Sequence, residues 1–407
     1  MKRLLSAVLI AAMGFMGAGA VCTDARAEGF ALYDWGARGS GLANGMVGRA
    51  DDPSAVAHNP AGITQLPGTQ IMVGASIITP KMLIDTIDGG VTTTSRVERH
   101  YHMIPHGFFT HQLNDSVWIG LGAFTRFGLG NQYPSGWPGV NNLQDVYLQT
   151  LSVNPNVAFK VTDRLSLAFG VEAMIARMNM HKRTMGLYQK MEAENGCGIG
   201  FNVAAHYKFN EQWAAGISYR SAINHKVSGE SSFYGPISMP SSSLRANLRL
   251  PDHIAAGVTY KPRKDLSFEV GTVYTVWSRF RNFNVHFGSP LNMSSYTGKD
   301  WKDTWLFNVS VEYLPLDWLA LRLGYSYETS PIPNGTADYM VETNGRQRYS
   351  CGVGFMLDNW TIDLAYSLLR AHELDYYESS LYTDGILPGK SRHGITHMGS
   401  VSVSYKF

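Results

Sequence analysis

The end of the chain, Val401–Phe407, alternates between apolar and polar side chains. Successive side chains of a β-strand point to opposite faces, so such a segment is oily on one face and polar on the other. The alternation is clearest over Trp318–Glu328, where leucines and tyrosines share one face and Arg322 and Glu328 lie on the other. About fourteen such runs follow one another after Thr69, which predicts an all-β chain.

We expect strands over Thr69–Thr79, Tyr101–Gln112, Ser116–Phe127, Tyr147–Val161, Arg164–Lys182, Cys197–Phe209, Gln212–Lys226, Leu244–Lys261, Leu266–Val285, Thr304–Leu314, Trp318–Glu328, Arg346–Leu357, Trp360–His372 and Ile395–Phe407.

The connections between these runs alternate between short and long. Asn114–Asp115 and Asp358–Asn359 are short, whereas Pro80–His100, Arg183–Gly196 and Glu373–Gly394 are long. This alternation is typical of outer-membrane barrels, which have tight periplasmic turns and long outer loops. The fold of a soluble β-sandwich does not require short and long loops to alternate. The sequence therefore predicts a transmembrane antiparallel β-barrel of about 14 strands.

Four tryptophans support this interpretation, because each follows a short connection: Trp118, Trp213, Trp318 and Trp360. We expect these side chains to lie at one membrane interface, where an amphipathic ring is stable.

The N-terminus indicates export. Basic residues precede the apolar run Leu4–Val21, and small residues follow at a spacing typical of a cleavage site, which predicts a secretory signal peptide over residues 1–27 and a mature start at Glu28. A lipoprotein modified at Cys22 is an alternative, although Val21 before it fits poorly. No later run of 18 apolar residues predicts a transmembrane helix.

The composition agrees with a membrane barrel. Of the 407 residues only 16% are charged, while 42 are glycine and 12% are aromatic. The net charge of +2 gives no field that would attract nucleic acid, and we expect no such partner. Cys197 and Cys351 remain in the mature chain; an oxidising compartment would allow them to pair, but the sequence does not show that they do.

Residues 28–68 lack the alternation and are rich in Gly, Ala, Asn and Asp. They could form a flexible tail or a plug inside the barrel. A barrel of this size needs filling or leaves a pore, so we expect a plug, or hatch, over residues 28–68 and the barrel over residues 69–407.

Within this segment the chain resembles the FadL-type outer-membrane transport family, whose best-known members take up long-chain fatty acids. The resemblance rests on Gly39–Ala43, on Asp51–Ile63 with its Asn-Pro-Ala core, on Tyr219–Ser221, on Tyr274–Ser278 and on the terminal Tyr405–Phe407. It covers the whole mature chain. It implies passive uptake of a hydrophobic compound by binding in the lumen, rearrangement of the hatch and lateral release through the barrel wall.

The resemblance also implies roles for particular residues. Phe30 would reach the ligand pocket, and Lys182, Arg183 and Lys302 would meet a fatty-acid carboxylate. Alternatively, these basic residues face only water or the phosphate groups of lipopolysaccharide. Met174 and Met178 precede Lys182, and their flexible thioethers suit an adaptable apolar pocket, although methionine also fills ordinary gaps.

Further implied roles concern the moving parts. Asn59, Pro60 and Ala61 would hold the hatch, and Gly128 would kink the third strand where the lateral gap forms. Glycine permits such a kink, although a strand-end glycine is an equal alternative. An external groove would include Phe233, Tyr234, Ile237 and Met239, but the third outer loop at Arg183–Gly196 is short for this purpose.

The sequence offers no catalytic motif, so we expect no enzyme and no cofactor. His100, His102 and His106 share a strand face; metal binding is conceivable, but we interpret them as a polar stripe and expect no metal. The expected partners are a fatty acid or another hydrophobic compound, outer-membrane lipid and lipopolysaccharide, and the barrel-insertion machinery. We expect a monomer in the outer membrane of a Gram-negative bacterium. The alternatives are uptake of uncharged aromatic hydrocarbons, and a surface adhesin or phage-receptor barrel.

Overall fold

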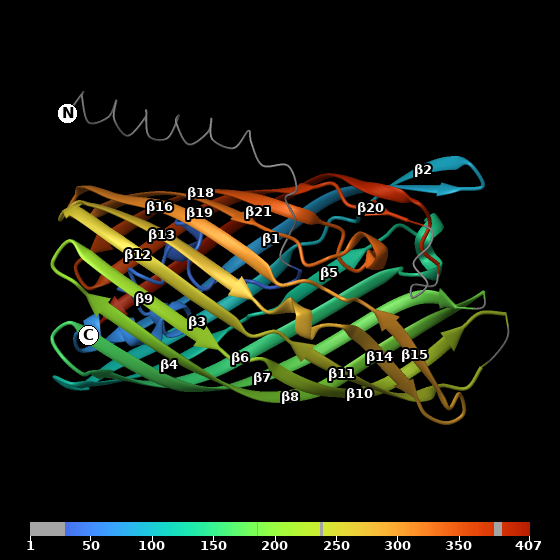
Figure 1. Cartoon of the computed structure of the whole chain (residues 1–407), viewed down its shortest axis with the longest axis horizontal. Coiled ribbons are helices and arrows are strands. Elements are labelled where there is room, and N and C mark those ends of the chain that lie inside the picture. Colours follow the sequence, from blue (N-terminus) through green and yellow to red (C-terminus); the bar gives the residue numbers. More distant parts are fainter. Residues whose placement is uncertain (1–28, 185, 237–238, 378–384) are drawn as a thin grey trace.

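The computed structural model describes residues 29–407 except 185, 237–238 and 378–384. Its strands form one antiparallel sheet, in which β1 (Thr69–Asp88) pairs with β21 (Gly389–Lys406) and so closes a barrel (Figure 1). Closure pairs the first strand with the last, so neither is left as a free edge in lipid. The barrel wall has 14 strand positions, as the sequence predicted.

The remaining strands are β2 (Val91–Arg96), β3 (His102–Asn114), β4 (Val117–Phe124), β5 (Gly128–Gln132), β6 (Asp145–Lys160), β7 (Leu165–Thr184), β8 (Leu187–Lys208), β9 (Trp213–Arg220), β10 (Ile223–Tyr234), β11 (Ser242–Leu250), β12 (His253–Arg263), β13 (Leu266–Thr275), β14 (Asn282–Phe287), β15 (Met293–Gly298), β16 (Thr304–Leu316), β17 (Leu319–Glu328), β18 (Asn344–Leu357), β19 (Trp360–His372) and β20 (Asp375–Tyr376).

The alternation found in the sequence places apolar side chains on the outer face of the wall. On β17, Leu321 and Leu323 are about half exposed, whereas Arg322 between them is buried and points into the lumen. The same division holds on β7, where Phe169 is exposed and Glu172 is buried. Burying each CH₂ in lipid gains roughly 0.8 kcal/mol, so the outward leucines stabilise the barrel only when it lies in a membrane.

Three of the four tryptophans agree with the predicted interface. Trp213, Trp318 and Trp360 are exposed near the short turns. The prediction is wrong for Trp118, which is buried and donates its indole N–H to the carbonyl oxygen of Leu66 at 2.8 Å. Trp118 points inward because it occupies one of the alternate positions of β4 that face the lumen. Its place directly after a short turn does not show which face it occupies.

The strands run further toward the long loops than the sequence predicted. β7 continues to Thr184 and β8 begins at Leu187, so the expected loop Arg183–Gly196 is largely a strand hairpin. β10 and β11 extend in the same way. Beyond the membrane both faces of a strand meet water or loops, so the oily alternation on which the prediction depended is lost there.

The segment that precedes the barrel, residues 29–68, lies within it. It contains the short helices α2 (Ala37–Gly41), α3 (Ala55–His58) and η2 (Pro60–Gln65), drawn in blue at the short-turn end of the barrel in Figure 1. α2 contacts β17, β18, β19 and β21, while η2 contacts β4, β6, β7 and β8. This N-terminal segment therefore spans the lumen from wall to wall.

Three further short helices lie in the connections: η3 (Pro138–Asn141), η4 (Trp277–Arg279) and η5 (Asn334–Thr336). Within the described part of the chain, no helix is long and apolar enough to span a membrane.

Candidate functional site

The barrel wall is interrupted at the third strand position. β4 ends at Phe124 and β5 resumes at Gly128, and both pair with β6. β3 pairs with β4 only from Gly107 to Asn114, and no pairing joins β3 to β5 over the described residues. The wall therefore has a gap between the His102–His106 part of β3 and β5.

The N-terminal segment occupies the edge of this gap. Leu32 donates its N–H to the carbonyl oxygen of Arg126 at 2.8 Å, and Gly128 donates its N–H to that of Phe30 at 3.0 Å. These bonds satisfy backbone groups that a kinked strand would otherwise leave unpaired in the membrane. A Cβ at Gly128 would lie 2.9 Å from Leu32 Cδ1, so glycine permits the close approach of the two segments.

A cavity of about 520 Å³ adjoins the gap. Lumenal residues such as Phe30, Tyr33 and Leu148 line it, and so do Met103 and Leu151, which point to the outer face of the barrel. Met103 is 69% exposed and Leu151 is 41% exposed. Because the lining comes from both faces of the wall, the cavity reaches through the wall at the gap.

Phe30 inserts its ring into a cluster of aromatic side chains beside this cavity. Its ring centroid lies 4.8 Å from Trp277, 5.7 Å from Trp301, 5.9 Å from Phe280 and 6.2 Å from Phe127. Aromatic pairs at such distances contribute roughly 0.5–1.5 kcal/mol each beyond their buried area. We call Phe127, Trp277, Phe280 and Trp301 the aromatic box.

The two arginines that line the cavity already have acidic partners. Arg346 pairs with Glu328, and Arg348 Nη2 lies 2.6 Å from Asp34 Oδ1. Lys81 is exposed and lies at the cavity rim. A carboxylate placed deep in the cavity would compete with Glu328 or Asp34 for an arginine.

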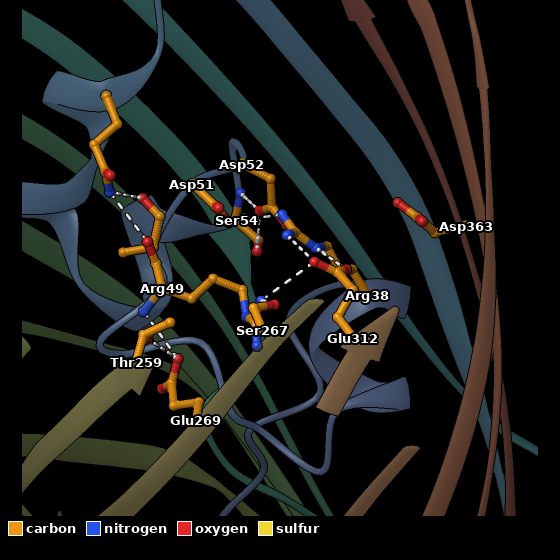
Figure 2. Close-up of polar contacts among 12 residues, drawn as sticks. Arg38, Arg49, Asp51, Asp52, Ser54, Thr259, Ser267, Glu269, Glu312 and Asp363 are labelled. Atoms are coloured by element: carbon orange, nitrogen blue, oxygen red, sulfur yellow. Dashed lines mark hydrogen bonds and ion pairs between the residues drawn. The ribbon is translucent and has the colours of Figure 1, made fainter. Parts of the chain in front are cut away.

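Below the cavity, charged side chains hold the N-terminal segment against the wall (Figure 2). Arg38 forms two bonds to Glu312, at 2.8 and 2.9 Å, and Arg322 forms a further ion pair with Glu312 at 2.6 Å. Glu269 accepts the backbone N–H groups of Val47 and Arg49, each at 2.8 Å. Charge-assisted bonds of this kind are about twice as strong as neutral ones.

The predicted hatch motif forms a second anchor. The side-chain N–H group of Asn59 donates to the carbonyl oxygens of Val47 and Ala205, and its side-chain oxygen accepts the N–H of Ala61. Pro60 occupies the first turn of η2, where its missing N–H costs nothing. Arg220, fully buried on β9, donates to the carbonyl oxygen of Ala57 at 2.8 Å.

Asp51 shows that this region is held by charge. Burial alone would raise the pKa of its carboxyl, but Arg38 and Lys261 outweigh burial and lower the pKa to about 2. Because this folded-state pKa lies below the ordinary value, the stabilisation is present above about pH 4 and is lost only as the pH falls toward 2. The anchor therefore persists through the physiological pH range.

The predicted ligand residues lie in three different places. Phe30 lines the cavity, and so does Gly128, which was predicted as the kink of the third strand. Met174 and Met178 are buried on the inner face of β7, and Met178 borders a separate void of about 20 Å³. Lys182 is half-buried, and it does not line the cavity.

Arg183 and Lys302, the other predicted carboxylate partners, are exposed and do not line the cavity either. Of the predicted external groove, Phe233 and Met239 are half-buried and Tyr234 is exposed. Ile237 lies outside the described residues, as does the predicted signal peptide. The roles of these residues stay predictions.

The histidines and cysteines form no assembled site. His102 lines the cavity, while His106 bonds Ser402 Oγ at 2.9 Å. Over the described residues, no three His, Cys, Asp or Glu side chains gather as a metal site. Cys197 and Cys351 are free and exposed.

Sequence reasoning missed several residues of the cavity and its anchors. The expected strand Leu266–Val285 is wrong at Trp277, because β13 ends at Thr275 and Trp277 lies in η4. Trp301 lies in a connection, where no strand alternation assigns a face. Glu342 and Arg348 line the cavity, and Arg220 anchors the N-terminal segment. Arg220 could have been found, because a charged residue at an inward strand position must have a partner in the lumen.

The comparisons with known proteins agree with this architecture. A family described as "Outer membrane protein transport protein (OMPP1/FadL/TodX)" matches residues 18–407. The long-chain fatty acid transport protein of Escherichia coli O6:H1 is 21% identical, over 88% of this chain and 90% of its own length.

Two solved structures share the fold. A FadL homologue of Pseudomonas aeruginosa superposes with a TM-score of 0.81 at 21% identity, covering 93% of this chain and 100% of its own. The toluene transporter TbuX of Ralstonia pickettii superposes with a TM-score of 0.73 at 17% identity, covering 93% of this chain and 99% of its own.

Proposed function

Because the chain belongs to the OMPP1/FadL/TodX family of outer-membrane transport proteins, we propose that it carries its hydrophobic cargo by lateral diffusion through the gap between β3 and β5. Cargo enters from the long-loop side, binds in the cavity and leaves sideways into the membrane. The main support for this proposal is that residues from both the inner and the outer face of the wall line the cavity.

The site explains why cargo would not cross straight to the periplasm. The N-terminal segment closes the lumen below the cavity, and buried ion pairs hold it in place. Breaking one buried pair costs roughly 3–5 kcal/mol. An apolar molecule gains nothing from those polar groups, whereas the membrane beside the gap can take up its apolar surface.

Release requires only a local rearrangement. Phe30, Ala31 and Leu32 touch the gap, while the ion pairs start at Asp34 and continue beyond it. The first residues of the N-terminal segment can therefore move away from Gly128 while the remainder stays anchored. Such a change would weaken binding of the cargo, as release of a tightly enclosed molecule requires.

We propose a long-chain fatty acid as the first cargo to test. A related family member is named for that cargo, and a cavity of about 520 Å³ lies in the range of sites that enclose ligands of drug size. An uncharged aromatic hydrocarbon is the second candidate. It is favoured by the aromatic box, which already encloses the phenyl ring of Phe30.

Uptake of both cargoes by the same cells tests the proposal. Cells that lack other family members would express this chain, and accumulation of radiolabelled palmitate and toluene would be compared with cells carrying an empty vector. We expect faster accumulation of at least one of the two labels. Equal accumulation of both labels with and without the chain, at matched outer-membrane amounts, would refute the proposed transport.

A further inference from the structure

Glu342 is a carboxyl group that faces the cavity without a cationic partner. It lies in the connection between β17 and β18, is only 5% exposed and lines the cavity. The described part of the chain places no Lys or Arg at ion-pair distance from it. Buried carboxylates are normally paired, so an unpaired one that lines a binding cavity calls for an explanation.

The surroundings of Glu342 are phenolic. The hydroxyl group of Tyr133 donates to Glu342 Oε1, and the carbonyl oxygen of Tyr339 lies 2.9 Å from the same hydroxyl. No described group bonds the other carboxyl oxygen, Oε2. Because the residue lines the cavity, Oε2 is the atom available to a bound molecule.

We propose that Glu342, in its protonated form, donates a hydrogen bond from Oε2 to the carboxylate head of a hydrophobic cargo. At pH 7 the two carboxyl groups share the proton that Glu342 already holds, whereas at higher pH, where Glu342 has lost it, binding must take up one proton. An O–H···O⁻ bond is short and strong. This inference rests on the proposed function and narrows the cargo to a carboxylate that carries an apolar tail.

The charges around the cavity favour this arrangement over an arginine clamp. Arg346 and Arg348 are neutralised by Glu328 and Asp34, so a cargo carboxylate would have to break a pair to reach either arginine. A protonated carboxyl can hold the head group without breaking any pair.

The protonation state agrees with the geometry. Burial, opposed only by the bond from Tyr133, raises the pKa of Glu342 to about 8. Burial also raises the pKa of Tyr133 well above its usual value and that of Tyr339 to about 12. Tyr376 also interacts electrostatically with Glu342 and with Asp338, which is paired with Lys299, and the ion pair Glu328–Arg346 lines the same cavity. Glu342 is therefore the group nearest the head that changes charge between pH 7 and 9.5.

Binding measured against pH tests the inference on the full-length protein in mild detergent. The probes are dodecanoate, which stays ionised throughout this range, and 1-dodecanol, which has no charge. We expect dodecanoate affinity to fall about tenfold or more from pH 7 to 9.5, the range for one bond to a charged group. Dodecanol affinity should change by less than about twofold, because an ionised Glu342 still accepts its hydroxyl.

Glu342→Gln should make dodecanoate binding independent of pH, because an amide donates at every pH. Glu373→Gln is the matched control, since Glu373 is an exposed carboxylate paired with Lys390, and it should retain the wild-type fall. The comparison of dodecanoate with dodecanol binding uses only the wild-type protein, so it tests the inference even if Glu342→Gln does not fold.

Two results would overturn the inference alone: dodecanoate affinity that is the same at pH 7 and 9.5, or a fall that survives in Glu342→Gln. Binding of neither probe to the wild-type protein would refute the proposed function itself, and the inference with it.

Discussion

At the short-turn end of the lumen, Arg38, Glu312 and Glu269 fasten the N-terminal segment to the wall by short charge-assisted bonds. Beside the gap, Phe30 packs against aromatic rings, and its carbonyl oxygen accepts the N–H of Gly128. The first region is a polar anchor that cargo cannot replace. The second is an apolar contact for which a hydrophobic molecule can substitute. Under the proposed mechanism, this difference lets one continuous segment combine a fixed closure with a movable tip.

Removing the closure should have the largest effect. Deletion of residues 29–68 leaves a barrel of this size unfilled, so it should conduct small ions on the order of tenfold more than the intact protein. Hydrophobic uptake should fall at the same time, because Phe30 and Leu32 are lost. Planar-bilayer conductance and cargo uptake measure the two effects, and a deletion variant that conducts no more than the wild type would contradict a lumen closed by this segment.

Breaking one anchor should have the next largest effect. Arg220→Ala removes the bonds to Val56 and Ala57 and one partner of buried Glu172. We expect a loss of roughly 3–5 kcal/mol in the free energy of unfolding. Arg245→Ala, at an exposed arginine of β11, is the control and should cost under about 0.5 kcal/mol. Denaturant unfolding in detergent compares them; equal stabilities would argue against a charged anchor.

A change at the tip should affect transport more than stability. Gly128→Val places side-chain atoms against Leu32, where even a Cβ would lie at 2.9 Å. We expect cargo uptake to change severalfold while the free energy of unfolding changes by about 1–3 kcal/mol, the usual cost of overpacking. Gly399→Val is the control, because no atom lies within 4 Å of a Cβ there. Equal cargo uptake by the two variants would indicate that cargo does not pass through the gap.

The smallest effect is expected from the basic residues that the resemblance suggested. Lys182, Arg183 and Lys302 do not line the cavity, so replacing all three with alanine should change fatty-acid affinity by less than about twofold, as for substitutions away from a site. Equilibrium binding of labelled fatty acid measures this. A loss of tenfold or more would restore their predicted role and move the head group away from Glu342.

These regions differ in how well the sequence predicted them. The wall followed from alternation, because lipid outside and a polar lumen inside impose a period of two, as over Trp318–Glu328. The position of residues 28–68 in the lumen was predicted from the size of the barrel, while the hatch role that the resemblance implied for Asn59-Pro60-Ala61 stays a prediction. The aromatic box was not predicted, because Phe127, Trp277, Phe280 and Trp301 come together around Phe30 only through contacts between distant parts of the chain. Trp118 shows that residue type alone does not predict which face of the wall a side chain occupies. Its position in the alternation along the strand is needed as well.

Photo-crosslinking of a hydrophobic cargo most directly tests lateral release past a fixed closure. A diazirine-labelled fatty acid would be illuminated with the protein in outer-membrane vesicles, and the labelled residues would be identified by mass spectrometry. We predict labels on Phe30, Phe127, Leu148 and the outward-facing Met103. Labels on the buried polar residues Asn154 of β6, Asn202 of β8 and Ser267 of β13, which bonds Arg49 of the N-terminal segment, would contradict lateral release and indicate a path to the periplasm.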